Sequence, residues 1–267
     1  MSTPGTTRYI IVGMQRSGTT ATHRALFGHP NICAMDDEFR VQPFFTKGVG
    51  CFTVGGVNRW ERLRNYNRLF DAVTIYPTNA PDPDGKRLIA YCGTPRFPKQ
   101  ELRANGLKVA IPNANDAKLL ADSLVEYFPG LKVIHVRRDD WVAQYASLLR
   151  AQKSGKWHSW SAAKDGASQN PPGKFAIAVE DFTAYVRMAQ EIDAQLARLL
   201  GTHEVCEFSF ENDLESNAAG AWDRLFQFVG VPPMAPEWMG SSKVAPPVDE
   251  FIENVAELRE LLARLRA

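Results

Sequence analysis

Short apolar runs alternate with amphipathic stretches along most of the chain. Short apolar runs predict strands at residues 9–14, 107–111, 131–136 and 204–209, and the nearly unbroken run at 131–136 is typical of a parallel strand that is buried on both faces. Apolar residues that recur every three or four positions predict helices, at residues 21–27, 114–128, 141–152, 179–200, 218–229 and 248–265. Strands that alternate with helices are typical of the α/β class, with a mostly parallel sheet and helices on both faces.

The pattern is weaker between residues 40 and 105. Residues 46–57 contain four glycines and are expected to form a loop, and residues 58–73 show apolar positions at helical spacing. A short strand is expected at residues 88–92, and residues 154–174 mix glycine and proline with aromatic side chains. No polar linker or internal repeat divides the chain, so we expect a single domain over residues 1–267 with two insertions, 40–105 and 154–174.

Composition and charge narrow the possible partners. The chain has 267 residues, of which 45% are hydrophobic and 23% are charged, with a formal net charge of +1. This balance gives no general attraction to nucleic acid or acidic membranes, so any anion site must be local. The four cysteines are far apart and form no C-x-x-C pair, which predicts free thiols, no metal site and a cytoplasmic location. No apolar stretch is long enough to span a membrane.

The most informative stretch joins the first predicted strand to the first predicted helix and reads Gly13-Met14-Gln15-Arg16-Ser17-Gly18-Thr19-Thr20. Its spacing is that of a nucleotide phosphate loop, G-x-x-x-x-G-K-[ST], except that Thr19 replaces the lysine. A buried strand that feeds a helix N-terminus directs several backbone N–H groups to one point, which suits a phosphate or sulfate group. Without the lysine, the loop is poorly equipped for a nucleoside triphosphate and its magnesium ion. Arg16 supplies positive charge instead.

Two segments together resemble the nucleotide-binding segments of sulfotransferases that use 3′-phosphoadenosine-5′-phosphosulfate (PAPS). Residues 13–20 look like their 5′-phosphosulfate loop, and residues 133–147 resemble their 3′-phosphate-binding segment. Residues 148–157 are similar to the bacterial trehalose sulfotransferase type. The resemblance covers most of the chain. It implies a P-loop-type fold and transfer of a sulfuryl group from PAPS to an acceptor hydroxyl, without a metal, leaving adenosine 3′,5′-bisphosphate.

The same resemblance assigns nucleotide-binding residues. The 5′-phosphosulfate is expected to bind the backbone N–H groups and hydroxyls of the loop, from Gln15, Arg16, Ser17, Gly18, Thr19 and Thr20. Arg16 is also expected to stabilise the charge that builds on the bridging oxygen. Arg138 and Ser147 are expected to hold the 3′-phosphate, but they are nine positions apart instead of the usual eight. Either the turn at residues 139–140 carries one extra residue, or an ungapped match places Ala146 at the serine position.

The acceptor hydroxyl has an unperturbed pKa far above 7, so its attack needs a general base. Glu38 precedes an aromatic segment and matches the setting in which carbohydrate sulfotransferases place a catalytic glutamate. Asp36 and Asp37 stay open as alternatives, since a count against the trehalose type places them near the same position, and His29 is a further alternative. The acceptor is expected to be a hydroxylated small molecule, sugar or glycolipid, bound by the acceptor-binding or lid insertions 40–105 and 154–174.

Two other functions stay open at this point. A nucleotide or nucleoside kinase of P-loop fold would need magnesium and a lysine in the loop. A non-catalytic nucleotide-binding protein would keep Arg138 but would tolerate the loss of Glu38. The sequence carries no signal for the oligomeric state.

Overall fold

The computed structural model describes residues 7–40, 49–54, 57–62, 103–127, 130–155, 173–216, 219–234 and 246–267. The strands in this part of the chain form one seven-stranded sheet of order β4-β3-β2-β5-β1-β6-β7. Five neighbouring strands run parallel: β1 (Thr7–Met14), β2 (Ile32–Arg40), β5 (Ala104–Ile111), β6 (Lys132–Arg137) and β7 (Val205–Ser209). An antiparallel hairpin, β3 (Val49–Val54) and β4 (Val57–Arg62), extends the sheet at β2. The predicted mostly parallel α/β sheet is confirmed.

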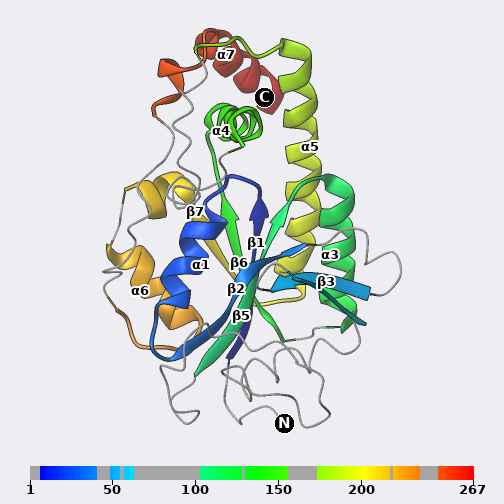
Figure 1. The fold of residues 1–267 in the computed structure, drawn as a ribbon, viewed down its shortest axis with the longest axis vertical. Coiled ribbons are helices and arrows are strands. Elements are labelled where there is room, and N and C mark those ends of the chain that lie inside the picture. Colours follow the sequence, from blue (N-terminus) through cyan, green and yellow to red (C-terminus); the bar gives the residue numbers. More distant parts are fainter. Residues whose placement is uncertain are drawn as a thin grey trace.

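Helices cover both faces of the sheet, as Figure 1 shows. One face carries α1 (Thr19–Phe27) and α6 (Ala219–Phe228), and the other carries α3 (Ala114–Tyr127) and α5 (Val179–Ala197). Two further helices lie beyond the carboxyl ends of β1 and β6, at the top of Figure 1: α4 (Trp141–Ser154) and α7 (Val255–Arg266). Three short turns complete the described elements: η5 (Arg198–Gly201), η6 (Phe210–Glu215) and η7 (Val248–Glu250).

The core has two layers because successive residues of each strand point to opposite faces of the sheet. Ile10 and Val12 of β1 pack in the layer that contains α3, α4, α5 and α7. Tyr9 and Ile11 of the same strand pack in the layer that contains α1 and α6. All four side chains are 0–3% exposed, as expected for a parallel strand in the middle of a sheet.

The topology creates a binding position at the carboxyl end of β1. β1 lies between β5 and β6, and the chain leaves β1 into α1 on one face. It leaves the neighbouring β6 into α4, which packs in the opposite layer. Ligands of open α/β sheets bind where two adjacent strands send their connections to opposite faces. The two segments singled out in the sequence therefore meet at the carboxyl ends of β1 and β6.

Several local predictions were wrong. Residues 49–54 form a strand instead of a loop, and residues 58–62 form its partner strand instead of the start of a helix. So short an apolar pattern fits both the helical and the strand period. The antiparallel pairing of residues such as Cys51 and Trp60 gives two strands. The carboxylates at residues 36–38 lie on β2. The remainder of the helix predicted at 58–73 and the strand predicted at 88–92 lie outside the described residues.

The predicted C-terminal helix is interrupted. Residues 248–250 form a single 3-10 turn, and α7 begins only at Val255. The break occurs because the Asn254 side chain bonds both backbone groups of Ile177, accepting from its N–H (3.0 Å) and donating to its carbonyl (2.9 Å). No helix in the described part of the chain has the length and apolarity that a membrane span requires.

Candidate active site

The loop after β1 folds as a tight turn. The Ser17 N–H donates to the Met14 carbonyl (3.2 Å), and Arg16 inside this turn has a φ of 66°. Among the described residues, Arg16 is the one non-glycine residue with positive φ. L residues avoid this left-handed conformation unless the surroundings impose it, and such strain concentrates at functional sites. The turn therefore marks the loop as a specialised segment.

Each glycine of the loop has its own structural reason, close packing at Gly13 and a positive φ at Gly18. A Cβ on Gly13 would lie 2.4 Å from the backbone oxygen of Val136, so only glycine lets β1 approach β6 this closely. Gly18 has a φ of 102°, and a Cβ there would lie 2.5 Å from Leu214 Cδ1. The spacing seen in the sequence thus fixes the loop against β6 on one side and against η6 on the other.

The N-terminus of α1 presents donors to the same region. Gly18 occupies the N-cap, no side chain caps the helix within the described residues, and no acidic residue lies in the first turn. Ser17 is 1% exposed, and its Oγ has no hydrogen-bond partner in the described part of the chain. Uncapped N–H groups and the positive end of the helix dipole favour an anion at this position.

The second segment follows β6. Asp140 caps α4 by accepting from the Ala143 N–H (2.9 Å), and the two arginines before it diverge. Arg137 pairs with Glu207 of β7 (2.9 Å). Arg138 turns to the loop, and its Nη1 donates to the Arg16 carbonyl (3.3 Å). Its guanidinium carbon lies 4.3 Å from the centre of the Phe210 ring.

Helix α4 bonds the loop directly. Arg16 Nε donates to Ser147 Oγ (3.0 Å), and the Gln144 side chain donates to the Gln15 carbonyl (2.9 Å). Ala146 instead lies in the apolar core with no exposed surface. The structure therefore brings together Arg16, Arg138 and Ser147, and it is Ser147 rather than Ala146 that reaches the loop.

Arg16 and Arg138 are both largely buried positive charges. Burial, and then the charge of Arg138, lower the pKa of Arg16 below its ordinary value. Burial also lowers the pKa of Arg138, against the opposing effect of Glu211, Asp140 and Glu215. An anion that binds between the two guanidinium groups would relieve this unfavourable charge, so the site is electrostatically prepared for one.

A buried lysine reaches the loop from the neighbouring strand. Lys108 of β5 is 5% exposed, and its Nζ donates to Thr20 Oγ1 (3.0 Å). Glu38 of β2 is in register with Lys108 in the β2–β5 pairing, just after a bulge between Ala34 and Glu38. This register places the backbone of Glu38 one strand away from the lysine that contacts the loop. The side chains of residues 33–40 lie outside the described part of the structure.

His29 is placed for a structural role. It lies beyond the C-terminal end of α1, whereas the loop precedes the N-terminal end of that helix. Its Nδ1 accepts from the Asn31 N–H (3.1 Å), and its Nε2 bonds the Pro232 carbonyl (2.9 Å). Burial lowers the pKa of His29, partly offset by the Pro232 carbonyl. Because both ring nitrogens are engaged away from the loop, we do not retain His29 as a candidate base.

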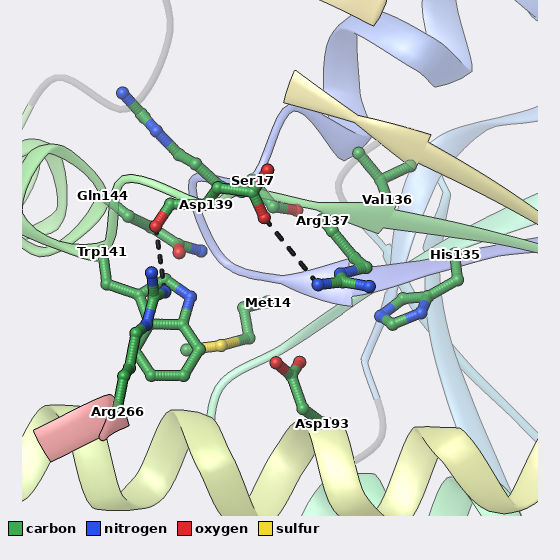
Figure 2. A pocket seen from close by; sticks show the side chains of 11 residues that line it. Met14, Ser17, His135, Val136, Arg137, Asp139, Trp141, Gln144, Asp193 and Arg266 are labelled. Atoms are coloured by element: carbon green, nitrogen blue, oxygen red, sulfur yellow. Dashed lines mark hydrogen bonds and ion pairs between the residues drawn. The ribbon is translucent and has the colours of Figure 1, made fainter. Parts of the chain in front are cut away.

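A small pocket that is open to solvent lies between the loop, the end of β6 and α5. Figure 2 shows Asp193 of α5 pointing into it toward His135 and Arg137. Arg266 crosses it from α7 and donates to the Asp139 carbonyl (2.9 Å). Burial raises the pKa of Asp193, against the nearby charges of His135 and Arg137. Of these groups, Arg266 bonds the β6–α4 turn directly.

Two of these contacts were not predicted from the sequence. Gln144, which is 1% exposed, and Glu211, which contacts the β6–α4 turn, belong to no motif. The interval of three residues between Gln144 and Ser147 places both on one side of α4, and this was the available signal for Gln144. No group of histidine, cysteine, aspartate and glutamate residues in the described ranges could hold a metal ion.

Comparisons with known proteins concern most of the chain. Residues 9–236 match the sequence model of the sulfotransferase family. Nodulation protein H of Rhizobium tropici is 22% identical over 237 residues, which cover 86% of this chain and 78% of that protein. Among solved structures, a sulfotransferase from Alicyclobacillus acidocaldarius is 14% identical, with a TM-score of 0.47, covering 97% of this chain and 90% of that chain. The sulfotransferase domain of the Synechococcus PCC 7002 olefin synthase is 11% identical, with a TM-score of 0.47, covering 100% and 98%.

Proposed function

Because this chain belongs to the sulfotransferase family, and is therefore an enzyme that transfers sulfuryl groups, we propose that its donor is PAPS and its acceptor a hydroxyl group. One observation carries the proposal: Arg16, Arg138 and Ser147, from two separate segments, meet at the N-terminus of α1, which no side chain of the described residues caps. PAPS carries anionic groups on the 5′ and the 3′ positions of its ribose, so its binding site needs two anion subsites side by side. Family membership also sets aside the kinase and the non-catalytic interpretations.

The described residues fit this donor. Ser17 Oγ is a buried hydroxyl without a partner among the described residues, and the N-terminus of α1 has no side-chain cap there. Buried polar groups normally have partners, so a bound sulfonate or phosphate oxygen would satisfy them. We assign the 5′-phosphosulfate to the backbone and hydroxyls of the loop, from Gln15, Arg16, Ser17, Gly18, Thr19 and Thr20. We assign the 3′-phosphate to Arg138 and Ser147.

When bound, PAPS supplies the sulfuryl group, and adenosine 3′,5′-bisphosphate is the product. The loop N–H groups and Arg16 would stabilise negative charge that increases in the transition state, which is the most effective use of preorganised donors. Lys108 adds a third cation at Thr20. Holding the reacting groups in line removes much of the entropic cost of the reaction.

We propose Glu38 as the general base that accepts the proton of the acceptor hydroxyl. Its support is the register with Lys108, which locates its backbone at the strand next to the one that contacts the loop. Asp36 and Asp37 stay as alternatives, because they lie at the β-bulge immediately before Glu38.

We further propose that the acceptor is a sugar or another hydroxylated small molecule, such as a glycolipid. The proposed acceptor segments are the insertions 40–105 and 154–174, within one domain of residues 1–267. The β3–β4 hairpin belongs to the first insertion and extends the sheet next to β2. A cytoplasmic location also stays a prediction.

Calorimetry with adenosine 3′,5′-bisphosphate and with ATP tests the donor. We expect the bisphosphate to bind without magnesium and more tightly than ATP, since the loop lacks the lysine of a triphosphate site. Tight ATP binding with no binding of the bisphosphate would contradict the proposal.

Activity assays test the base. The protein is incubated with PAPS and a panel of hydroxylated acceptors, and transfer is measured for the native chain and for Glu38→Gln. We expect the substitution to lower kcat by about 10²–10⁴-fold, the usual contribution of a general base. Asp36→Asn and Asp37→Asn are the matched controls, and full activity of Glu38→Gln would move the assignment to one of them.

A further inference from the structure

Glu211 of η6 is joined to the β6–α4 turn by three contacts. Its Oε1 lies 3.5 Å from Arg138 Nε. Its Oε2 accepts from the Asp139 N–H (2.9 Å), and its Oε1 accepts from the Asp140 N–H (3.2 Å). A single carboxylate therefore holds both the side chain of Arg138 and the backbone that follows it.

Arg138 is held on other sides as well. Its guanidinium lies over the ring of Phe210, the residue before Glu211, and its Nη1 donates to the Arg16 carbonyl (3.3 Å). A guanidinium has five N–H donors in a fixed plane. The Glu211 carboxylate lies at ion-pair distance from Nε, and the Arg16 carbonyl accepts one Nη1 hydrogen, so these two contacts leave other N–H groups of the guanidinium for an oxyanion.

The segment that carries Glu211 is itself held by contacts with its neighbours. Phe210 and Glu211 open the six-residue π-helical turn η6, a conformation that is rare and often occurs at functional sites. Asp213 closes the turn by accepting from the Ser209 N–H (2.7 Å), and it pairs with Arg224 of α6 (2.9 Å). Glu211 is therefore an anchored acceptor, and two backbone N–H groups neutralise part of its charge.

We propose that Glu211 is a positioning residue that fixes Arg138 in advance for the 3′-phosphate, and so sets the preference of the enzyme for 3′-phosphorylated nucleotides. The inference rests on the proposed function, since it concerns the same 3′-phosphate subsite. Its physical basis is preorganisation: a long side chain that is already held in place loses less freedom when the ligand binds. Arginine benefits most, because its planar fork must be aligned to bind a phosphate through two N–H groups.

The test compares two ligands that differ by the 3′-phosphate alone. Calorimetry gives the affinities for adenosine 3′,5′-bisphosphate and adenosine 5′-monophosphate, for the native chain, Glu211→Gln and Glu211→Ala. We expect both substitutions to lower the preference for the bisphosphate by about tenfold, the effect of one charge-assisted contact, with the affinity for the monophosphate unchanged. A general loss of fold would weaken both ligands together.

Glu215→Gln is the matched control. Glu215 lies on the same turn and also raises the pKa of Arg138, but the turn N–H groups donate to Glu211 instead. If Glu211 acted only through its negative charge, both Gln variants would tighten bisphosphate binding. We expect the preference to fall in Glu211→Gln and to be retained in Glu215→Gln.

Three outcomes are distinguishable. A native chain that prefers the bisphosphate, with a reduced preference in the Glu211 variants, supports the inference. The same native preference with an unchanged or increased preference in Glu211→Gln overturns the inference and leaves the proposed function intact. A native chain without any preference overturns both. Because the ratio of affinities is taken within each variant, a smaller folded fraction does not affect it.

Discussion

Arg16 combines an unfavourable backbone conformation with a side chain that the site uses. Its φ of 66° is the left-handed conformation that glycine adopts without strain, yet its Nε bonds Ser147 and its carbonyl accepts from Arg138. Such a conformation costs an L residue about 1–3 kcal/mol and persists where the surroundings determine it. The backbone strain and the side-chain chemistry can be separated by two substitutions at the same position.

We expect Arg16→Gly to be more stable than Arg16→Ala by about 1 kcal/mol, because glycine alone relieves the left-handed strain. Both variants remove the guanidinium, so both should lower kcat by about 10²-fold or more. Urea denaturation gives the difference in stability, and initial rates with PAPS give the difference in activity. Equal stability of the two variants would show that the backbone at Arg16 is not strained.

Gly13 gives a prediction on packing alone. A Cβ at this position would lie 2.4 Å from the Val136 oxygen, and both atoms belong to paired strands that cannot separate without loss of hydrogen bonds. We expect Gly13→Ala to lower the free energy of unfolding by about 3 kcal/mol. Gly220→Ala is the control: nothing lies within 4 Å of its added Cβ, and in α6 the alanine should stabilise by about 0.5–1 kcal/mol.

At this scale the sequence predicted what local spacing encodes. The glycine spacing, the absent lysine and the arginine at the end of a strand were all visible, and they singled out Arg16, Arg138 and Ser147, which contact one another in the structure. Glu211 and Gln144 were not visible, because each acts on a segment about 70 or 130 residues away, through contacts that no local pattern carries.

At the scale of elements, the buried parallel strands and the longer amphipathic helices were predicted well. A strand that is buried on two faces is apolar throughout, and an amphipathic helix has one apolar stripe. Both patterns can be recognised within a single segment of the sequence. The β3–β4 hairpin and the break before α7 were missed. Both depend on partners elsewhere in the chain: β4 needs β3, and the break at Asn254 needs Ile177.

The pairing of β6 with β7 predicts a pH dependence. His135 Nδ1 lies 3.6 Å from Glu207 Oε1, an ion-pair distance, and Arg137 Nη1 donates to Glu207 Oε2 at 2.9 Å. The His135 ring and the Arg137 guanidinium together lower the pKa of Glu207 from 4.5 to about 2. A carboxylate with a lowered pKa stabilises the fold above its unfolded pKa, and this contribution is lost as the pH falls toward about 2.

We therefore expect Glu207→Gln to cost about 1 kcal/mol at pH 7, a value reduced for solvent screening because the side chain is 44% exposed. The difference from the native chain should shrink as the pH falls from about 4.5 toward 2. Urea denaturation at pH 7, 4.5 and 3 measures it. A difference that stays constant over this range would mean that the charge of Glu207 does not contribute.

At the scale of the whole molecule, the sheet order joins distant segments at one edge, and α7 adds a further support. The family match ends at residue 236, whereas α7 begins at Val255. Nevertheless Arg266 donates to the Asp139 carbonyl (2.9 Å), and its guanidinium lies 4.1 Å from the centre of the Trp141 ring. A helix outside the matched region thus supports the β6–α4 turn.

We expect Arg266→Ala to lower the free energy of unfolding by about 1 kcal/mol, from one hydrogen bond and one cation–π contact. It should also weaken binding of adenosine 3′,5′-bisphosphate about threefold, because the turn that carries Arg138 loses a support. Arg264→Ala on the same helix is the control and should change neither quantity. Thermal melts and calorimetry measure both, and equal effects of the two variants would assign no role to the Arg266 contacts.

The pairing of β1 with β5 has a consequence for how this fold can diversify. Ala104 of β5 pairs with Thr7 of β1 on one side and with Ile32 of β2 on the other. The segment between β2 and β5, which carries the β3–β4 hairpin, is therefore a long loop whose two ends lie on neighbouring strands. The entropy of closing a loop grows only with the logarithm of its length, about 0.6 kcal/mol for each doubling. Lengthening or replacing this segment is therefore inexpensive for the parallel sheet, whose strand ends carry the loop and the β6–α4 turn. On the proposed assignment of this segment to the acceptor, new acceptor specificities can arise by exchange of one segment while the proposed donor site stays unchanged.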